Sequence, residues 1–146
     1  MTRRPGFRAF DRGGEIGQSL VEFALILPLF LGLVVGIYEF GRAWNVYQVL
    51  TNTAREGARL AVIPTSDQSD VQTVIDQGLQ RAALDPSQAT LAVTGLGDGT
   101  GSPTTVQLSY PYQFQFIGPV VAFLQGPDDS MTGGITLSTT VVMRNE

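Results

Sequence analysis

The chain has 146 residues, a formal net charge of −4, and neither cysteine nor histidine. The missing cysteines exclude disulfides and thiolate zinc sites, and the missing histidines remove the commonest metal ligand and the usual general base at neutral pH. The acidic balance makes nucleic acid a poor partner, because binding to phosphates needs a basic patch. We therefore expect no metal, no cofactor and no nucleic acid.

The first 17 residues are basic and the rest of the chain is acidic. Four arginines stand against two acidic residues in this leader, whereas five arginines stand against eleven acidic residues in the remainder. Basic residues in front of a hydrophobic span favour retention of that flank in the cytoplasm. We expect the N-terminus to stay inside and the remainder to cross the membrane.

Residues 20–38 form an apolar segment in which only Glu22 and Pro28 are neither apolar nor glycine. As a helix these nineteen residues would extend about 28 Å, close to the thickness of the hydrocarbon core of a bilayer. A secretory signal peptide also has a basic start and an apolar core. Here the apolar stretch is longer, and no small-residue cleavage motif follows Tyr38, so we predict one membrane crossing.

Glu22 is a carboxylate near the start of this span. It could simply be tolerated near the headgroups. Alternatively, a cut after Gly17 would give Gln18 a new α-amino group, and this amine on a neighbouring copy or partner could compensate the charge of Glu22. The spacing then indicates an assembly device.

Gly17 followed by Glu22-Phe23 resembles the cleavage motif of type IV prepilins, in the variant used by Tad (tight adherence) pilus systems. Four further segments resemble the TadE-like branch of that group: "VEFALILPLF" (21–30), "YEFGRAW" (38–44), "TAREGARLAV" (53–62) and "ITLSTTVVMR" (135–144). The resemblance implies that a membrane prepilin peptidase cuts between Gly17 and Gln18, and that Glu22 later serves in docking. Gln18 and Ser19 depart from the commonest type IV pattern, which has an aromatic residue and a threonine there.

One long helix is predicted from residue 18 to residue 63. Within the span, Gly32 and Gly36 form a G-x-x-x-G pair, which allows two membrane helices to touch but also arises by chance. Beyond the span, small and apolar residues recur at helical spacing from Ala43 to Ala61. This stripe fits the protein's own sheet, alone or together with a partner helix. Glu39 and Arg42 are expected to form a solvated pair at the membrane edge.

A short amphipathic helix follows, with its start predicted at Ser69, which has capping-box spacing to Gln72, and its end at Asp85-Pro86. Alternating residues then predict strands at 90–94, 106–116 and 135–143, and Pro111 indicates an edge position or a bulge. The glycine-rich connection at 95–103 lacks the lysine of a phosphate-binding loop. Residues 117–127 either cover the sheet or present an apolar surface, and Asp128 and Asp129 are expected in a solvated loop.

The predicted fold class is α+β and pilin-like: a long N-terminal helix, transmembrane in its first half, one short amphipathic helix and a small antiparallel sheet of about three strands. The expected parts are a leader (1–17), the long helix (18–63) and an extracytoplasmic domain (64–146). No catalytic site is expected, because the aspartates lie in turns and helix starts, where aspartate is ordinarily structural.

The resemblance implies a minor pilin, or pseudopilin, in the assembly or initiation of a Tad-type pilus at the inner membrane. Its implied partners are the prepilin peptidase, other pilin-like subunits, the inner-membrane pilus platform and the lipid bilayer. The alternatives are a single-pass, membrane-anchored binding or adhesion module that never enters a filament, and a major filament subunit.

Overall fold

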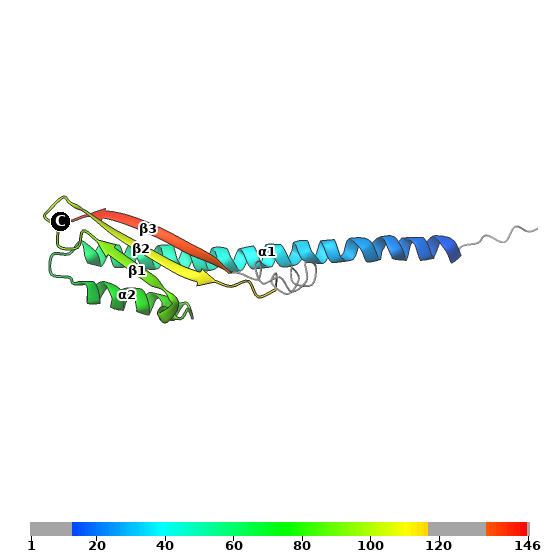
Figure 1. Cartoon of the computed structure of the whole chain (residues 1–146), viewed down its shortest axis with the longest axis horizontal. Coiled ribbons are helices and arrows are strands. Elements are labelled where there is room, and N and C mark those ends of the chain that lie inside the picture. The colour runs from blue at the N-terminus through cyan, green and yellow to red at the C-terminus, as the bar shows by residue number, and fades with distance from the viewer. Residues whose placement is uncertain (1–12, 117–133, 146) are drawn as a thin grey trace, which may run out of the picture.

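The computed structural model describes residues 13–116 and 134–145. Its longest element is α1 (Gly13–Ala61), whose 49 residues extend about 74 Å at 1.5 Å per residue. The first half of α1 projects beyond the rest of the molecule, and the second half lies against α2 and the sheet (Figure 1). The molecule is therefore a rod with a small folded unit at one end.

The sheet has three antiparallel strands in the order β1-β2-β3: β1 (Thr90–Thr94), β2 (Pro103–Tyr112) and β3 (Ile135–Arg144). The first strand coincides with the predicted one, and the third ends one residue later than predicted. The second begins at Pro103, before the predicted start at residue 106. The second ends at Tyr112, before the predicted end at residue 116, because the N–H groups of Gln115 and Phe116 donate to a side chain of α1 and not to a strand. The predicted apolar segment 117–127, Asp128 and Asp129 lie outside the described residues.

Pro111 lies in the central strand but at a locally open position. The pairing of β1 with β2 ends at Thr90 and Ser109, so that Pro111 faces only Thr136 of β3 among the described strands. Proline cannot donate to a ladder and is tolerated where one side of the strand is unpaired. The prediction of an edge strand or a bulge is therefore corrected: Pro111 lies in the central strand, at a position that the shorter β1 leaves unpaired on one side.

The hydrophobic core lies between the second half of α1, α2 (Gln68–Arg81) and one face of the sheet. Its buried members are Leu50, Ala54, Ala58, Ala61, Val71, Ile75, Leu79, Val106, Leu108 and Tyr110. The small residues of the predicted stripe let the sheet and α2 come close to α1. The stripe therefore packs on the protein's own domain, and the α+β architecture is confirmed.

The start of α2 corrects the prediction that Ser69 begins it. The N-cap is Asp67, whose Oδ1 accepts from the N–H of Asp70 (2.9 Å), while Oδ2 of Asp70 accepts from the N–H of Asp67 (3.1 Å). The hydroxyl of Ser69 instead donates to Oδ1 of Asp67 (2.6 Å). A carboxylate is a strong acceptor for the first N–H groups of a helix, which explains why it takes the capping position.

The end of α2 also differs from the prediction. The helix stops at Arg81, four residues before the expected boundary at Asp85, because Ala83 adopts a left-handed conformation (φ 57°). The N–H of Leu84 donates to the carbonyl of Leu79, and that of Ala83 donates to the carbonyl of Gln80. This is the Schellman pattern of helix ends. It turns the chain so that Leu84 packs against the core.

The glycine-rich connection between β1 and β2 is fastened to the end of β3. Nδ2 of Asn145, a buried side chain, donates to the carbonyls of Gly95 (3.2 Å) and Asp98 (2.7 Å). The backbone of Asn145 also bonds to Gly101 and Ser102. This connection therefore has a structural role in closing the far end of the sheet.

Candidate functional site

The first half of α1 exposes apolar side chains in every direction. The large apolar residues between Leu20 and Tyr38 have exposed fractions from 36% to 78%, except Val35, which is half-buried. Within the described residues, one helix is long and apolar enough to cross a membrane, with a mean hydropathy of 2.5 in its most apolar window. A helix that is apolar all round requires lipid or other helices around it.

The predicted cleavage site lies on an accessible part of this helix. Gly17 and Gln18 are exposed, and a Cβ atom built on Gly17 finds no described atom within 4 Å. Nε2 of Gln18 donates to Oε1 of Glu22, at a distance of 3.1 Å. The structure thus brings these three residues together on one stretch of α1, whereas their roles in cleavage and docking stay predictions.

The pair Gly32 and Gly36 meets nothing in the described part of the chain, because a Cβ atom at either position finds no neighbour within 4 Å. The close glycine contacts lie elsewhere. A Cβ atom on Gly57 would lie 2.8 Å from Cδ1 of Ile75, and one on Gly78 would lie 2.6 Å from Cγ2 of Thr53. Among the described residues, none packs against Gly32 or Gly36, so the predicted contact face stays a prediction.

Glu39 follows directly on the apolar segment and is fully buried, which corrects the expectation of a solvated pair with Arg42. Its carboxyl group accepts from the hydroxyl of Tyr112 (3.1 Å) and from the N–H groups of Gln115 (2.7 Å) and Phe116 (2.6 Å). Three converging donors compensate the burial of this group. We call this arrangement the Glu39 clasp; it fastens the end of β2 to α1.

Electrostatics keep the phenol of Tyr112 in the donating form. Burial raises the pKa of Tyr112, and the hydrogen bond to Glu39 raises it further. Arg42 lies one helical turn after Glu39, and its Nη1 is buried without a hydrogen-bond partner among the described residues. The polar side chains of Glu39, Tyr112 and Arg42 are thus buried, at least in part, directly after the apolar segment.

Residues 17–59 match the family model described as TadE-like protein. In this segment, under a third of its length, the chain is similar to the TadE-like family. The match confirms the resemblance noted at 21–30 and 38–44, and it ends shortly before α1 does. No curated protein and no solved structure matches the chain.

The TadE-like segment therefore contains the predicted cleavage site, the membrane-competent helix, Glu39 and much of the core-facing stripe of α1. It leaves out α2 and all three strands. The resemblance noted at 135–144 stays a prediction.

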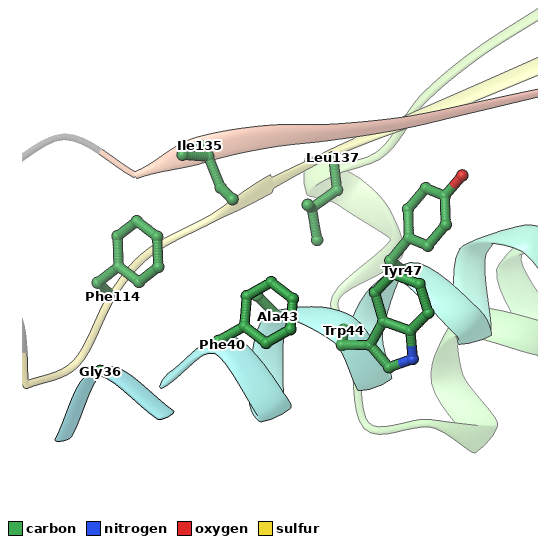
Figure 2. A pocket seen from close by; sticks show the side chains of 8 residues that line it. All are labelled: Gly36, Phe40, Ala43, Trp44, Tyr47, Phe114, Ile135 and Leu137. Atoms are coloured by element: carbon green, nitrogen blue, oxygen red, sulfur yellow. The ribbon is translucent and has the colours of Figure 1, made fainter. Parts of the chain in front are cut away.

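An apolar groove opens where the TadE-like segment meets the sheet. It has a volume of about 480 Å³ and is lined by five residues of α1 between Gly36 and Tyr47, together with Phe114, Ile135 and Leu137. Figure 2 shows these residues on α1, on the segment that follows β2 (Phe114) and at the start of β3 (Ile135 and Leu137), around the space between them. None of the lining residues carries a charge.

Four exposed aromatic residues lie at the same end of the domain: Tyr38, Phe40, Trp44 and Phe116, with exposed fractions of 55%, 68%, 53% and 50%. Phe40 stacks on Trp44 at a centroid distance of 6.3 Å, and Phe116 lies edge-on to Tyr38 at 5.8 Å. We call these four residues the aromatic belt. Alternation in 106–116 predicted Phe116 on the sheet face, but it lies exposed beside α1.

The Glu39 clasp was missed by the sequence reasoning. The motif "YEFGRAW" placed Glu39 in a family segment, and that was the one available signal. Its three donors come from residues more than 70 positions away along the chain. No local spacing could have brought them together.

Proposed function

We propose that this chain is a minor pilin-like subunit, or pseudopilin, that takes part in assembly or initiation of a Tad-type pilus after cleavage between Gly17 and Gln18. The observation that carries the proposal is the first half of α1, which matches the TadE-like model from residue 17, is apolar and largely exposed, and has Glu22 as its one charged residue between residues 17 and 38. Such a helix needs lipid around it before assembly and other helices around it afterwards. The proposed role is interaction and not catalysis.

The proposed topology is a single pass through the inner membrane. Residues 20–38 span the bilayer, the basic leader stays in the cytoplasm, and α2 and the sheet lie outside it. Support comes from the arginines before the span and from the position of the folded domain at the other end of α1 (Figure 1).

The proposed docking role of Glu22 starts from its hydrogen bond with Gln18. After cleavage, Gln18 would carry a free α-amino group. An amine on a neighbouring pilin-like subunit would give Glu22 an ionic partner in place of the amide, and a charge removed from water is best compensated by an opposite one. The inner-membrane pilus platform would bring the subunits together.

The cleavage step is tested by mass spectrometry of the N-terminus of the native protein extracted from membranes. We expect the wild-type chain to begin at Gln18. We expect the Gly17→Lys chain to keep its leader, because a side chain would enter a site that the resemblance reserves for glycine. Gly14→Lys adds the same charge one helical turn earlier and is the matched control, which should be cut normally. A wild-type chain that begins at Met1 or Thr2 in a host with an active prepilin peptidase contradicts the proposal.

Entry into the pilus is tested separately with Glu22→Gln. We expect this variant to be cut and to remain in the membrane but to be lost from the sheared pilus fraction, whereas Glu56→Gln, on the outer half of α1, is retained there. Wild-type protein that is cut but never copurifies with pilus components would favour the membrane-anchored binding module.

A further inference from the structure

We propose that the aromatic belt anchors the folded domain in the outer headgroup layer of the bilayer, so that the end of β2 rests on lipid. This inference rests on the proposed membrane span and adds a second lipid contact, made by the domain itself. The occupant of the belt and of the adjoining groove is the lipid bilayer.

The depth of the belt fits the interface. Trp44 lies six residues after Tyr38, so its Cα is about 9 Å beyond the end of the span. Long side chains on a helix lean toward its N-terminus, which brings the indole ring back by about one turn. The headgroup layer on each side of a bilayer is about 5–8 Å thick. Tyr38, Phe40 and the ring of Trp44 then all lie in or near this layer.

The belt lies on two opposite sides of α1 and does not form a one-sided patch. Successive residues of a helix are rotated by about 100°, so Tyr38 and Phe40 differ by about 200° and point to opposite sides. A second protein molecule would cover one side of α1, whereas a bilayer covers all sides. The composition agrees, because tryptophan and tyrosine are enriched at membrane interfaces.

The Glu39 clasp places the residues that follow β2 at the same depth in the headgroup layer. The N–H of Phe116 donates to Oε1 of Glu39, one residue after the end of the span. The ring of Phe116 packs on Tyr38, the last residue of the span. The end of β2 is therefore held at the membrane surface by contacts within the chain.

The uncharged groove continues this surface. It begins at Gly36, inside the span, and runs past Phe40 to Tyr47 beneath Phe114 and Ile135 (Figure 2). Because its inner end is at membrane depth and its lining is apolar, lipid can enter it directly from the bilayer. Lipid then covers the aromatic surface that is exposed between the span and the folded domain.

Trp44 is the chain's one tryptophan and therefore a natural depth probe. The full chain is reconstituted at low density into phosphatidylcholine vesicles whose acyl chains carry bromine either near the glycerol or near the terminal methyl group. We expect bromine near the glycerol to quench Trp44 more strongly than bromine near the methyl end, and we expect aqueous acrylamide to quench it weakly.

Three variants in a Trp44→Phe background complete the test. Phe30→Trp reports the middle of the span and is expected to lose most fluorescence to bromine near the methyl end. Phe116→Trp reports the end of β2 and is expected to behave like Trp44. Ile63→Trp, at an exposed position just past the far end of α1, is the control that should respond to acrylamide and not to brominated lipid.

The outcomes separate this inference from the proposed function. If bromine quenches Phe30→Trp while acrylamide quenches Trp44 freely, the span stands and the anchor is overturned. If bromine does not quench Phe30→Trp, the membrane span itself fails, and the anchor fails with it. A third outcome depends on protein density. If acrylamide quenches Trp44 at low protein density, and neither acrylamide nor bromine quenches it at high density, then a second copy covers the belt. The lipid anchor is then overturned.

Discussion

The carboxyl group of Glu39 fastens the end of β2 to α1 directly after the apolar segment of the helix. Its partners Tyr112, Gln115 and Phe116 all come from the end of β2 and the residues that follow it. A buried acceptor with three donors is costly to remove, because each donor is then left without a partner. We therefore expect the clasp to contribute more to the free energy of unfolding than its small buried area suggests.

Replacement of Glu39 by alanine should destabilise the domain strongly. The hydroxyl of Tyr112 is a buried donor, and leaving such a donor unpaired costs about 1–3 kcal/mol, whereas the N–H groups of Gln115 and Phe116 belong to exposed residues that water can reach. Tyr112→Phe removes one hydrogen bond to a carboxyl group and should cost about 1.5–3 kcal/mol. Chemical unfolding of the full chain in detergent, followed by the near-ultraviolet signal of its aromatic residues, measures both changes.

Glu56→Ala is the matched control for this prediction. Glu56 lies on the same helix, but its side chain is 55% exposed and makes only a long ion pair with Arg81. Exposed pairs contribute about 0–1 kcal/mol. An equal loss of stability in Glu39→Ala and Glu56→Ala would argue against the clasp.

At the scale of elements, glycine and threonine set the distance between α1 and α2. Gly78 of α2 lies directly against Thr53 of α1, where a Cβ atom would come within 2.6 Å of the threonine methyl group. Thr53 is 5% exposed and, being β-branched, has little freedom to turn away. The two helices cannot keep this spacing if a side chain is added.

Gly78→Ala should therefore weaken the contact between the helices. Overpacking of this kind costs about 1–3 kcal/mol, which outweighs the gain of about 1 kcal/mol from the better helix propensity of alanine. Gly32→Ala adds the same methyl group where no described atom lies within 4 Å, and it should leave the unfolding midpoint unchanged. If Gly78→Ala is as stable as wild type, the contact is looser than the structure indicates.

The cap of α2 predicts a pH dependence. Hydrogen bonds from the side chain of Ser69 and from the backbone of Asp70 hold the pKa of Asp67 below its ordinary value of 3.8. A lowered pKa in the folded state contributes stability that is present above the ordinary pKa and is lost as the pH falls through the folded-state pKa. Acidification should therefore loosen the start of α2.

Asp67→Asn isolates this contribution, because asparagine caps helices well but does not titrate. The difference in Tm between wild type and Asp67→Asn should be largest near neutral pH and should disappear as the pH falls below the ordinary range of carboxyl groups. Thermal unfolding of both chains in detergent over a series of pH values measures it. A Tm difference that stays constant down to acidic pH would exclude this role for the charge of Asp67.

The strands could be predicted more closely than the ends of the helices. Apolar and polar residues alternate in 90–94 and 135–143 because one face of each strand packs on the core, and this alternation is visible in the sequence. The end of α2 depends on Ala83 in a left-handed conformation, a position that usually takes glycine, so no residue type announced it. Its start is at Asp67, two residues before the predicted cap Ser69, because the carboxylate of Asp67 accepts from the N–H of Asp70.

At the scale of the molecule, the folded unit does not depend on the projecting half of α1. The buried hydrophobic core begins at Ala43, and the clasp begins at Glu39. A chain that lacks residues 1–35 should keep its sheet and α2 and should unfold cooperatively at about the same denaturant concentration as the full chain. Hydrogen exchange of the β2 amides compares the two, and loss of protection in the shorter chain would contradict this independence.

The membrane-competent helix and the TadE-like segment could be predicted because both are local patterns in 17–62. The place where the domain contacts the helix could not be predicted in this way. The contacts of Glu39 and Tyr38 with the end of β2 join parts of the chain that only the complete topology brings together. The predicted cleavage and docking residues, Gly17, Gln18 and Glu22, lie far from these contacts along α1.

The unbroken course of α1 through Pro28 and into the core has a mechanical consequence. A continuous helix transmits rotation as well as length, so the direction in which the sheet faces is locked to the direction in which Glu22 faces. One residue inserted between them would turn the sheet by about 100° and raise it by about 1.5 Å. The helix therefore fixes an angle: a molecule that contacted Glu22 would meet one fixed side of the folded domain.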